Sequence, residues 1–147
     1  MKTPSPFIRE LLHSTSAALL ICLFLYAATS KLLDFDRFRG QLLNQAIPPE
    51  AAYPLAWILP VSEITAVALL LFRKTSPAGF LAATVLLAMF TGYIALVMLG
   101  FWQRVPCSCG GVLSHLGWRA HFWFNIFFLL AGITGLVTRP PARQAIR

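Results

Sequence analysis

The chain has 147 residues, of which 58% are hydrophobic and only 12% are charged, and this composition excludes an ordinary soluble globular protein. Its mean hydropathy of +0.72 is typical of an integral membrane protein. The net charge of +7 does not indicate a nucleic-acid partner, because the basic residues fall at the ends of apolar runs rather than on one soluble face. We therefore expect a single membrane domain over residues 1–147, in contact with lipid.

Four long apolar runs divide the chain, at residues 11–30, 54–72, 77–101 and 118–137. Each is close to the roughly 20 residues that a membrane-spanning helix needs. The sequence thus predicts an all-α fold, an integral membrane four-helix bundle. The first run also resembles a cleavable signal peptide in its basic start and apolar middle. We expect it to be retained, because it continues directly into Lys31-Leu32-Leu33-Asp34-Phe35, which is typical of the end of a packed helix.

A short segment with helical periodicity lies between the first two runs. Its apolar positions, Phe35, Phe38, Leu42 and Leu43, alternate with charged and amide residues. This pattern predicts a short amphipathic helix in the outer membrane interface. We expect it to end at the proline-containing segment 47–49.

Prolines mark the limits of the next two helices. We expect the second spanning helix to start near Pro54, since proline is tolerated at the first helical position. Pro60 should kink this helix, because a helix that began only after Pro60 would be too short to cross. The loop at residues 73–76 is short, so the second and third helices should be antiparallel neighbours. Ser76 is the expected N-cap and Pro77 the first helical residue.

Lysine and arginine are distributed unequally between the two sides that four spans define. Seven belong to the termini and the second loop: Lys2, Arg9, Arg73, Lys74, Arg139, Arg143 and Arg147. Five belong to the other side, among several acidic residues: Lys31, Arg37, Arg39, Arg104 and Arg119. Because basic loops tend to stay in the cytoplasm, we expect both termini inside a bacterial inner membrane and the loop before the last helix on the periplasmic side.

That loop contains Cys107-Ser108-Cys109-Gly110-Gly111. A disulfide between Cys107 and Cys109 would need a sharp turn and would be strained, and strained, exposed disulfides exchange readily. The pair can therefore be a redox dithiol, with Arg104 and the start of the last helix favouring a thiolate. It can also be a structural disulfide, although so small a loop removes little unfolded-state entropy. We favour the redox interpretation.

A third interpretation makes the pair half of a metal site completed by His115 and His121. The spacing matches no common zinc motif, so we expect no metal. Cys22 lies among Leu and Ile in the first run, and we expect it to be a buried small hydrophobe.

Glu63 is the one carboxylate inside an apolar run, and such residues are functional by default because a charge in the bilayer is costly. We expect it in the bundle interior, either handling protons or forming an ion pair with Lys31. The alternative is a structural hydrogen bond to Ser62, Thr65 or Tyr93.

The last run begins with Trp118, His121 and Asn125 on one helical face. This face is suited to a proton donor or to a quinone head group. Quinone is the one cofactor that the sequence suggests. It is equally suited to an interfacial tryptophan and a polar contact between helices. Gly132 and Gly135 should let another helix approach closely.

Three motifs occur in order along the chain: Tyr26-Ala27-x-x-x-Lys31-Leu32-x-Asp34-Phe35-x-x-Phe38, Leu59-Pro60-x-x-Glu63, and Pro106-Cys107-Ser108-Cys109-Gly110-Gly111. Together they resemble the MauE/DoxX family of redox-associated membrane proteins with four helices, over roughly residues 12 to 137. The bundle also resembles the vitamin K epoxide reductase and DsbB oxidases, which pass electrons from dithiols to quinone.

The resemblance implies disulfide formation or transfer with a periplasmic thioredoxin-like partner, during maturation of methylamine dehydrogenase. It makes Cys107 and Cys109 the redox pair, and Lys31, Asp34 and Glu63 match the family's polar signature. The chain departs from relatives that have Phe-Gly where it has Gly110-Gly111. It also lacks the second outer cysteine pair of the quinone-linked oxidases, so dithiol-to-quinone transfer by this chain alone is not implied.

We therefore expect a membrane component of a periplasmic thiol–disulfide relay, with thiol–disulfide oxidoreductase activity. Three alternatives remain. The chain can be a non-enzymatic scaffold whose disulfide is structural, a subunit of a quinone-linked thiol oxidoreductase, or a small transporter that uses Glu63.

Overall fold

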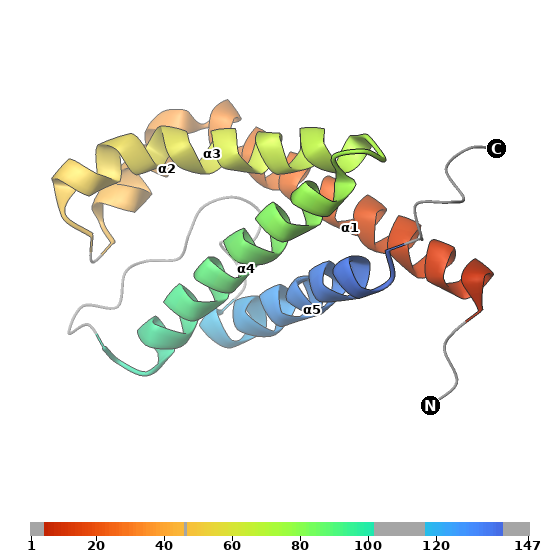
Figure 1. Ribbon diagram of the computed structural model, residues 1–147. Helices are drawn as coiled ribbons and strands as arrows, with labels where there is room; N and C mark the ends of the chain where they lie inside the picture. The colour runs from red at the N-terminus through yellow and green to blue at the C-terminus, as the bar shows by residue number, and fades with distance from the viewer. Residues whose placement is uncertain (1–4, 46, 102–116, 140–147) are drawn as a thin grey trace.

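A computed structural model of the chain describes residues 5–45, 47–101 and 117–139 (Figure 1). These residues form five helices: α1 (Pro6–Leu33), α2 (Phe35–Leu43), α3 (Pro49–Leu71), α4 (Ser76–Met98) and α5 (Trp118–Val137). All but α2 are long and apolar enough to cross a membrane. The chain is thus a multi-pass membrane protein, and the predicted all-α class with four long apolar helices is confirmed.

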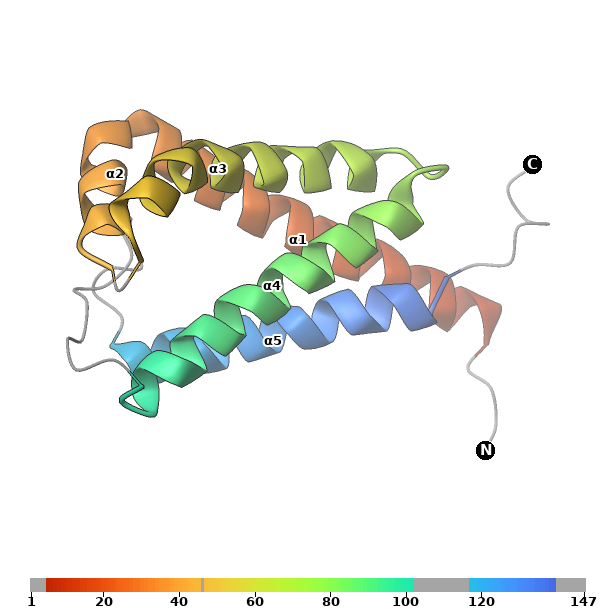
Figure 2. The same cartoon turned by 60° about the vertical axis from the view of Figure 1, so that its left-hand side comes forward.

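The four long helices form a ring in which each packs mainly against two others. α1 packs against α3 and α5, and α4 packs against the same two helices. Figures 1 and 2 show the start of α1, the α3–α4 turn and the end of α5 at one end of the bundle, which we term the terminal end. The opposite end, termed the α2 end, carries α2, the end of α4 and the start of α5 (Figure 2).

The centre of the bundle is an apolar cluster. Its buried members come from three helices: Leu20 and Phe24, Val67 and Leu70, and Phe80, Ala83 and Leu87. Partly buried side chains of α5 complete the cluster, among them Phe128 and Leu129. Since lipid tails are as apolar as these side chains, close packing rather than exclusion from water holds the helices together.

The amphipathic helix α2 is confirmed. Its buried residues, Phe38 and Leu42, pack against Ala52 and Ala56 near the start of α3. The charged residues face outward, and Arg39 pairs with Asp36 at 3.0 Å. α2 therefore covers the first turns of α3 with its apolar face.

The prediction that the second spanning helix starts near Pro54 is wrong. α3 begins at Pro49, and Pro48 precedes it as N-cap residue. The backbone amides of Ala51 and Ala52 both donate to the Pro48 carbonyl, at 2.9 and 3.0 Å. Pro49 meets the first-position preference of proline as well as Pro54 does, so the helix extends over an additional turn. Pro54 and Pro60 both lie inside α3.

Three other helix limits also differ from the predicted ones. α4 has Thr75 rather than Ser76 as its N-cap, with Ser76 as the first helical residue. It ends at Met98, ahead of Gly100, whose φ of 69° is left-handed and stops the helix. α1 starts at Pro6, earlier than expected, because the Ser5 hydroxyl accepts a hydrogen bond from Ile8 N and caps the first turn.

Candidate functional site in the bundle interior

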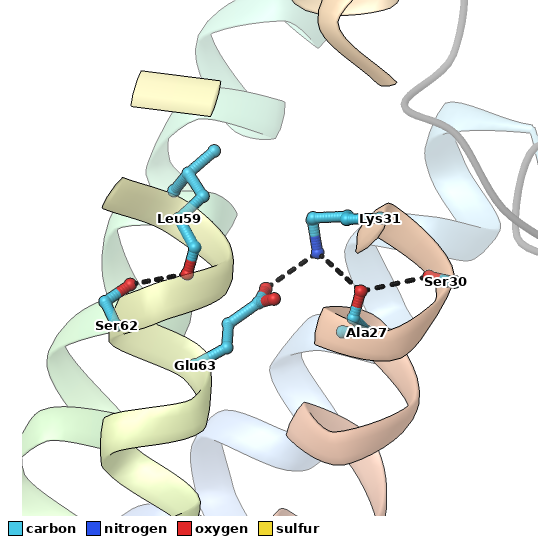
Figure 3. A network of polar contacts seen from close by, with 6 residues as sticks. All are labelled: Ala27, Ser30, Lys31, Leu59, Ser62 and Glu63. Carbon is cyan, nitrogen blue, oxygen red and sulfur yellow. Dashed lines mark hydrogen bonds and ion pairs between the residues drawn. The ribbon is translucent and has the colours of Figure 1, made fainter. Parts of the chain in front are cut away.

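A buried ion pair joins α1 to α3 (Figure 3). Lys31 Nζ lies 2.7 Å from Glu63 Oε1 and also donates to the Ala27 carbonyl at 3.2 Å. The Glu63 side chain is only 1% exposed and that of Lys31 is 19% exposed. Of the roles considered for Glu63, the ion pair with Lys31 is formed, while proton handling stays a prediction.

The sequence around each partner explains how the pair forms. Lys31 lies in the last turn of α1, where a cation is favoured by the helix dipole. Its ammonium also lies 5.8 Å from the centre of the Phe38 ring of α2. Pro60, one turn before Glu63, is buried and has no N–H to donate to the Ala56 carbonyl. The Ala56 carbonyl therefore lacks the backbone donor that another residue at position 60 would supply.

The hydrogen bonds proposed as alternatives for Glu63 are not formed. Ser62 Oγ donates to the Leu59 carbonyl at 2.8 Å, and Thr65 Oγ1 donates to a carbonyl of its own helix. Tyr93 donates to Gln45 Oε1 at 2.5 Å. Glu63 Oε2 is buried and has no hydrogen-bond partner among the described residues. One carboxylate oxygen of the pair is thus satisfied and the other is not.

Asp34 does not join this pair. It lies at the junction of α1 and α2, where it is the residue between the two helices. Its side chain is 59% exposed, and its charged contact is with Arg37 at 3.9 Å. Asp34 therefore belongs to the outer surface of the α2 end.

The face of α5 expected to be functional does point inward. Asn125 is buried at 6% exposure, and Trp118 and His121 are partly buried. The side chains of His121 and Asn125 form no hydrogen bond with any described residue.

The cysteine pair lies outside the described residues. Cys107 and Cys109, together with Arg104 and His115, belong to the segment between Phe101 and Gly117. Cys22 is described, and it is exposed on α1 rather than buried, so that prediction is wrong. Within residues 5–45, 47–101 and 117–139, no three His, Cys, Asp or Glu side chains are grouped to hold a metal ion.

A second polar junction, at the terminal end, was not predicted. His13 of α1 donates from Nδ1 to the Gly135 carbonyl of α5 at 2.9 Å, and its Nε2 lies 3.3 Å from Ser76 Oγ of α4. The His13 ring also packs on Phe80, with ring centres 4.8 Å apart. The Gly135 carbonyl is in the last turn of α5 and has no partner within its helix. A histidine in an apolar run was the available signal.

The similarity to known proteins extends over all five helices. The model of the family described as methylamine utilisation protein MauE matches residues 9–138, from α1 to the end of α5. The chain belongs to the MauE family. Methylamine utilization protein MauE of Paracoccus versutus is 32% identical to this MauE-family chain over 111 residues, which are 74% of the chain and 60% of the relative.

The MauE-family chain thus spans 60% of the length of that relative. No solved structure matches it. The resemblance inferred from the three motifs is confirmed for MauE, a family linked to methylamine utilisation.

Proposed function

We propose that this chain is the membrane component of a thiol–disulfide relay that serves methylamine utilisation at the periplasmic face of a bacterial inner membrane. The observation that carries the proposal is the Cys107-Ser108-Cys109 sequence inside the region matched by the MauE model. The segment that contains it connects α4 to α5, and both of these helices reach the α2 end. In this proposal the α2 end faces the periplasm and both termini lie in the cytoplasm.

The exchange proceeds by two displacements at sulfur. The thiolate of one cysteine attacks the disulfide of a thioredoxin-like partner, which forms a mixed disulfide and releases one partner thiolate. The second cysteine then attacks its neighbour's sulfur, which closes the Cys107–Cys109 bond and releases the second partner thiol. Two electrons and two protons pass to the partner, and the reverse sequence oxidises it.

The chain has groups suited to stabilise the attacking thiolate. Arg104 precedes Cys107 by three residues, and the N-terminus of α5 follows the pair. A cation and a helix N-terminus both lower the pKa of a nearby thiol. In this proposal the Lys31–Glu63 ion pair holds α1 to α3. It thereby supports the end of the bundle at which the cysteine pair acts.

The test is a trap for the mixed disulfide. Cys107→Ser and Cys109→Ser variants, expressed with the rest of a methylamine-utilisation system, should each leave one reactive thiol. One of them should accumulate a covalent complex with a thioredoxin-like protein, visible on a non-reducing gel and identified by mass spectrometry. Cys22→Ser is the matched control and should behave as the unmodified chain.

Alkylation of the cysteines before and after an oxidant pulse provides the second readout. We expect the Cys107/Cys109 pair to shift between oxidised and reduced forms. A pair that stays oxidised under every condition, together with normal function of the double Cys→Ser variant, would favour a non-enzymatic scaffold. Loss of function in Glu63→Gln but not in Cys→Ser variants would favour transport.

A further inference from the structure

Basic residues from three separate segments gather at the terminal end of the bundle (Figure 2). Arg9 lies in the first turn of α1, Arg73 and Lys74 lie in the α3–α4 turn, and Arg139 follows α5. Arg9 donates to the Arg139 carbonyl at 3.2 Å. Arg73 pairs at 3.1 Å with Glu10, the neighbour of Arg9 in the chain. These contacts join Arg9, Arg73, Lys74 and Arg139 into one surface, which we term the basic terminal surface.

The positive charge of this surface is not balanced by acidic side chains. Of the chain's five acidic residues, all within the described segments, only Glu10 lies at the terminal end. The exposed arginines of the α2 end differ in this respect, because Arg37 pairs with Asp34 and Arg39 pairs with Asp36. The basic terminal surface is therefore suited to an anion that the protein itself does not supply.

Large apolar side chains are exposed directly beside these basic residues. Phe7, two residues before Arg9, is 76% exposed, and Phe72, directly before Arg73, is 65% exposed. Val137, the last residue of α5, is 72% exposed. A dissolved anion or an acidic soluble protein matches only the basic groups. A phospholipid matches both, since its phosphate is joined to apolar chains.

The length of α1 places the surface at the depth of lipid phosphates. α1 has 28 residues and is therefore ~42 Å long, more than the ~30 Å of the hydrocarbon core. An exposed arginine in the first turn of so long a helix lies in the head-group layer. Basic groups between membrane helices at this depth are a recurring form of recognition for anionic lipid head groups.

The two arginines are held in place without using all of their donors. A guanidinium has five N–H donors and can give a phosphate two parallel hydrogen bonds. Among the described residues, Arg9 directs one nitrogen to the Arg139 carbonyl, and Arg73 directs one to Glu10. Both guanidinium groups thus have donors left for a ligand.

We propose that the basic terminal surface binds the phosphate of an anionic phospholipid, with Arg9 and Arg73 as the contacting groups. The apolar side chains beside them contact the acyl chains of the same lipid. This proposal goes beyond the relay and does not depend on it, because the surface includes neither Cys107 nor Cys109.

The test measures lipid binding to the purified full chain in dodecyl maltoside by native mass spectrometry. Phosphatidylglycerol and phosphatidylcholine with identical acyl chains are titrated separately. We expect phosphatidylglycerol to bind about tenfold more tightly. Excess ammonium phosphate should leave the lipid bound. Equal affinity for the two lipids overturns the proposal, and so does displacement by free phosphate, since the ligand would then be the anion alone.

Paired variants assign the preference to this surface. Arg9→Gln/Arg73→Gln should abolish the preference for phosphatidylglycerol. Arg37→Gln/Arg39→Gln is the matched control, because it removes the same charge from exposed side chains at the α2 end. It should leave the preference unchanged. Equal losses in the two double variants, or no loss in Arg9→Gln/Arg73→Gln, overturn the proposal.

A cross-linking arm uses the unmodified chain and so does not depend on how the variants fold. Phosphatidylglycerol with a photoreactive diazirine in its head group is bound and irradiated, and the labelled peptides are identified by mass spectrometry. We expect label in residues 6–13 or 71–75, and we expect excess unlabelled phosphatidylglycerol to suppress it. Label confined to α2 and the start of α3, or label that the unlabelled lipid does not suppress, overturns the proposal.

Discussion

At the scale of single residues, the polar groups inside the bundle differ in how completely they are satisfied. Glu63 is enclosed by protein, and Lys31 neutralises it through one oxygen at 2.7 Å. Asp34 and Arg37 also carry opposite charges, but they lie 3.9 Å apart and are each more than half exposed. A charge enclosed by protein depends on its partner far more than an exposed charge does. The two pairs should therefore respond differently to the same kind of substitution.

The variant Lys31→Met should destabilise the fold by about 3 kcal/mol or more, because it leaves a buried carboxylate without a counter-charge. Replacing both partners, as in Lys31→Met/Glu63→Leu, should recover much of this loss, since an apolar pair needs no partner. Unfolding of the purified protein in mixed micelles, followed by circular dichroism with increasing sodium dodecyl sulfate, measures the difference.

The control for this experiment is Asp34→Asn, which breaks the exposed pair with Arg37. We expect a change of about 0.5 kcal/mol or less, the usual magnitude for an exposed pair. If Lys31→Met were as mild as Asp34→Asn, the Lys31–Glu63 pair would not be the buried interaction that the structure describes.

At the scale of helices, α5 packs against α4 through glycines. A Cβ atom at Gly135 would lie 1.9 Å from Phe80 Cε1, and one at Gly132 would lie 2.6 Å from Thr84 Oγ1. The same region is joined to α1 by His13, which donates to the Gly135 carbonyl. Close approach at Gly135 therefore allows both the Phe80 contact and the hydrogen bond that satisfies the end of α5.

The variant Gly135→Ala should destabilise the fold by about 1–3 kcal/mol, because the methyl group forces the Phe80 ring to move within a packed core. Gly92→Ala in α4 is the matched control, since a Cβ at Gly92 has nothing within 4 Å. That control should be neutral or stabilising by up to about 1 kcal/mol, because alanine favours helices. The same micelle unfolding measurement compares them, and equal effects would contradict the α4–α5 packing.

These helices also show which features the sequence can predict. Long apolar runs and the periodicity of residues 35–43 depend on local composition, and they correctly predict the spans and α2. The start of α3 is not predictable in this way, because Pro49 and Pro54 satisfy the same local preference, and the hydrogen bonds to the Pro48 carbonyl show that the helix begins at Pro49. A histidine in an apolar run indicates a buried polar contact, but the partners of His13 lie in α4 and α5, more than 60 residues away in the chain, so no local pattern identifies them.

The candidate site was predictable for a different reason. A carboxylate within one apolar run and an ammonium directly after another can neutralise each other, so the Lys31–Glu63 pair follows from the cost of charge in a membrane. The exposure of Asp34 does not follow from its type, because its position depends on how α2 turns away from α1.

At the scale of the whole molecule, four long apolar helices bring the start of α1, the α3–α4 turn and the end of α5 to the same end of the bundle. The count of basic residues predicts that this end is cytoplasmic, with seven against five on the opposite side. In the structure the difference in the number of basic loop residues between the two ends is larger than this count. Lys31 is bound to Glu63 inside the bundle, so it is not a loop charge of the α2 end.

Single cysteines introduced at exposed positions test this orientation. In a chain whose three cysteines are replaced by serine, Asn44→Cys at the α2 end should react with a membrane-impermeant maleimide in cells with a permeabilised outer membrane. Thr75→Cys in the α3–α4 turn is the matched position and should react only after the inner membrane is opened. The reverse pattern would place the Cys107/Cys109 segment in the cytoplasm. Thiols are kept reduced there, so a periplasmic relay through this chain would be excluded.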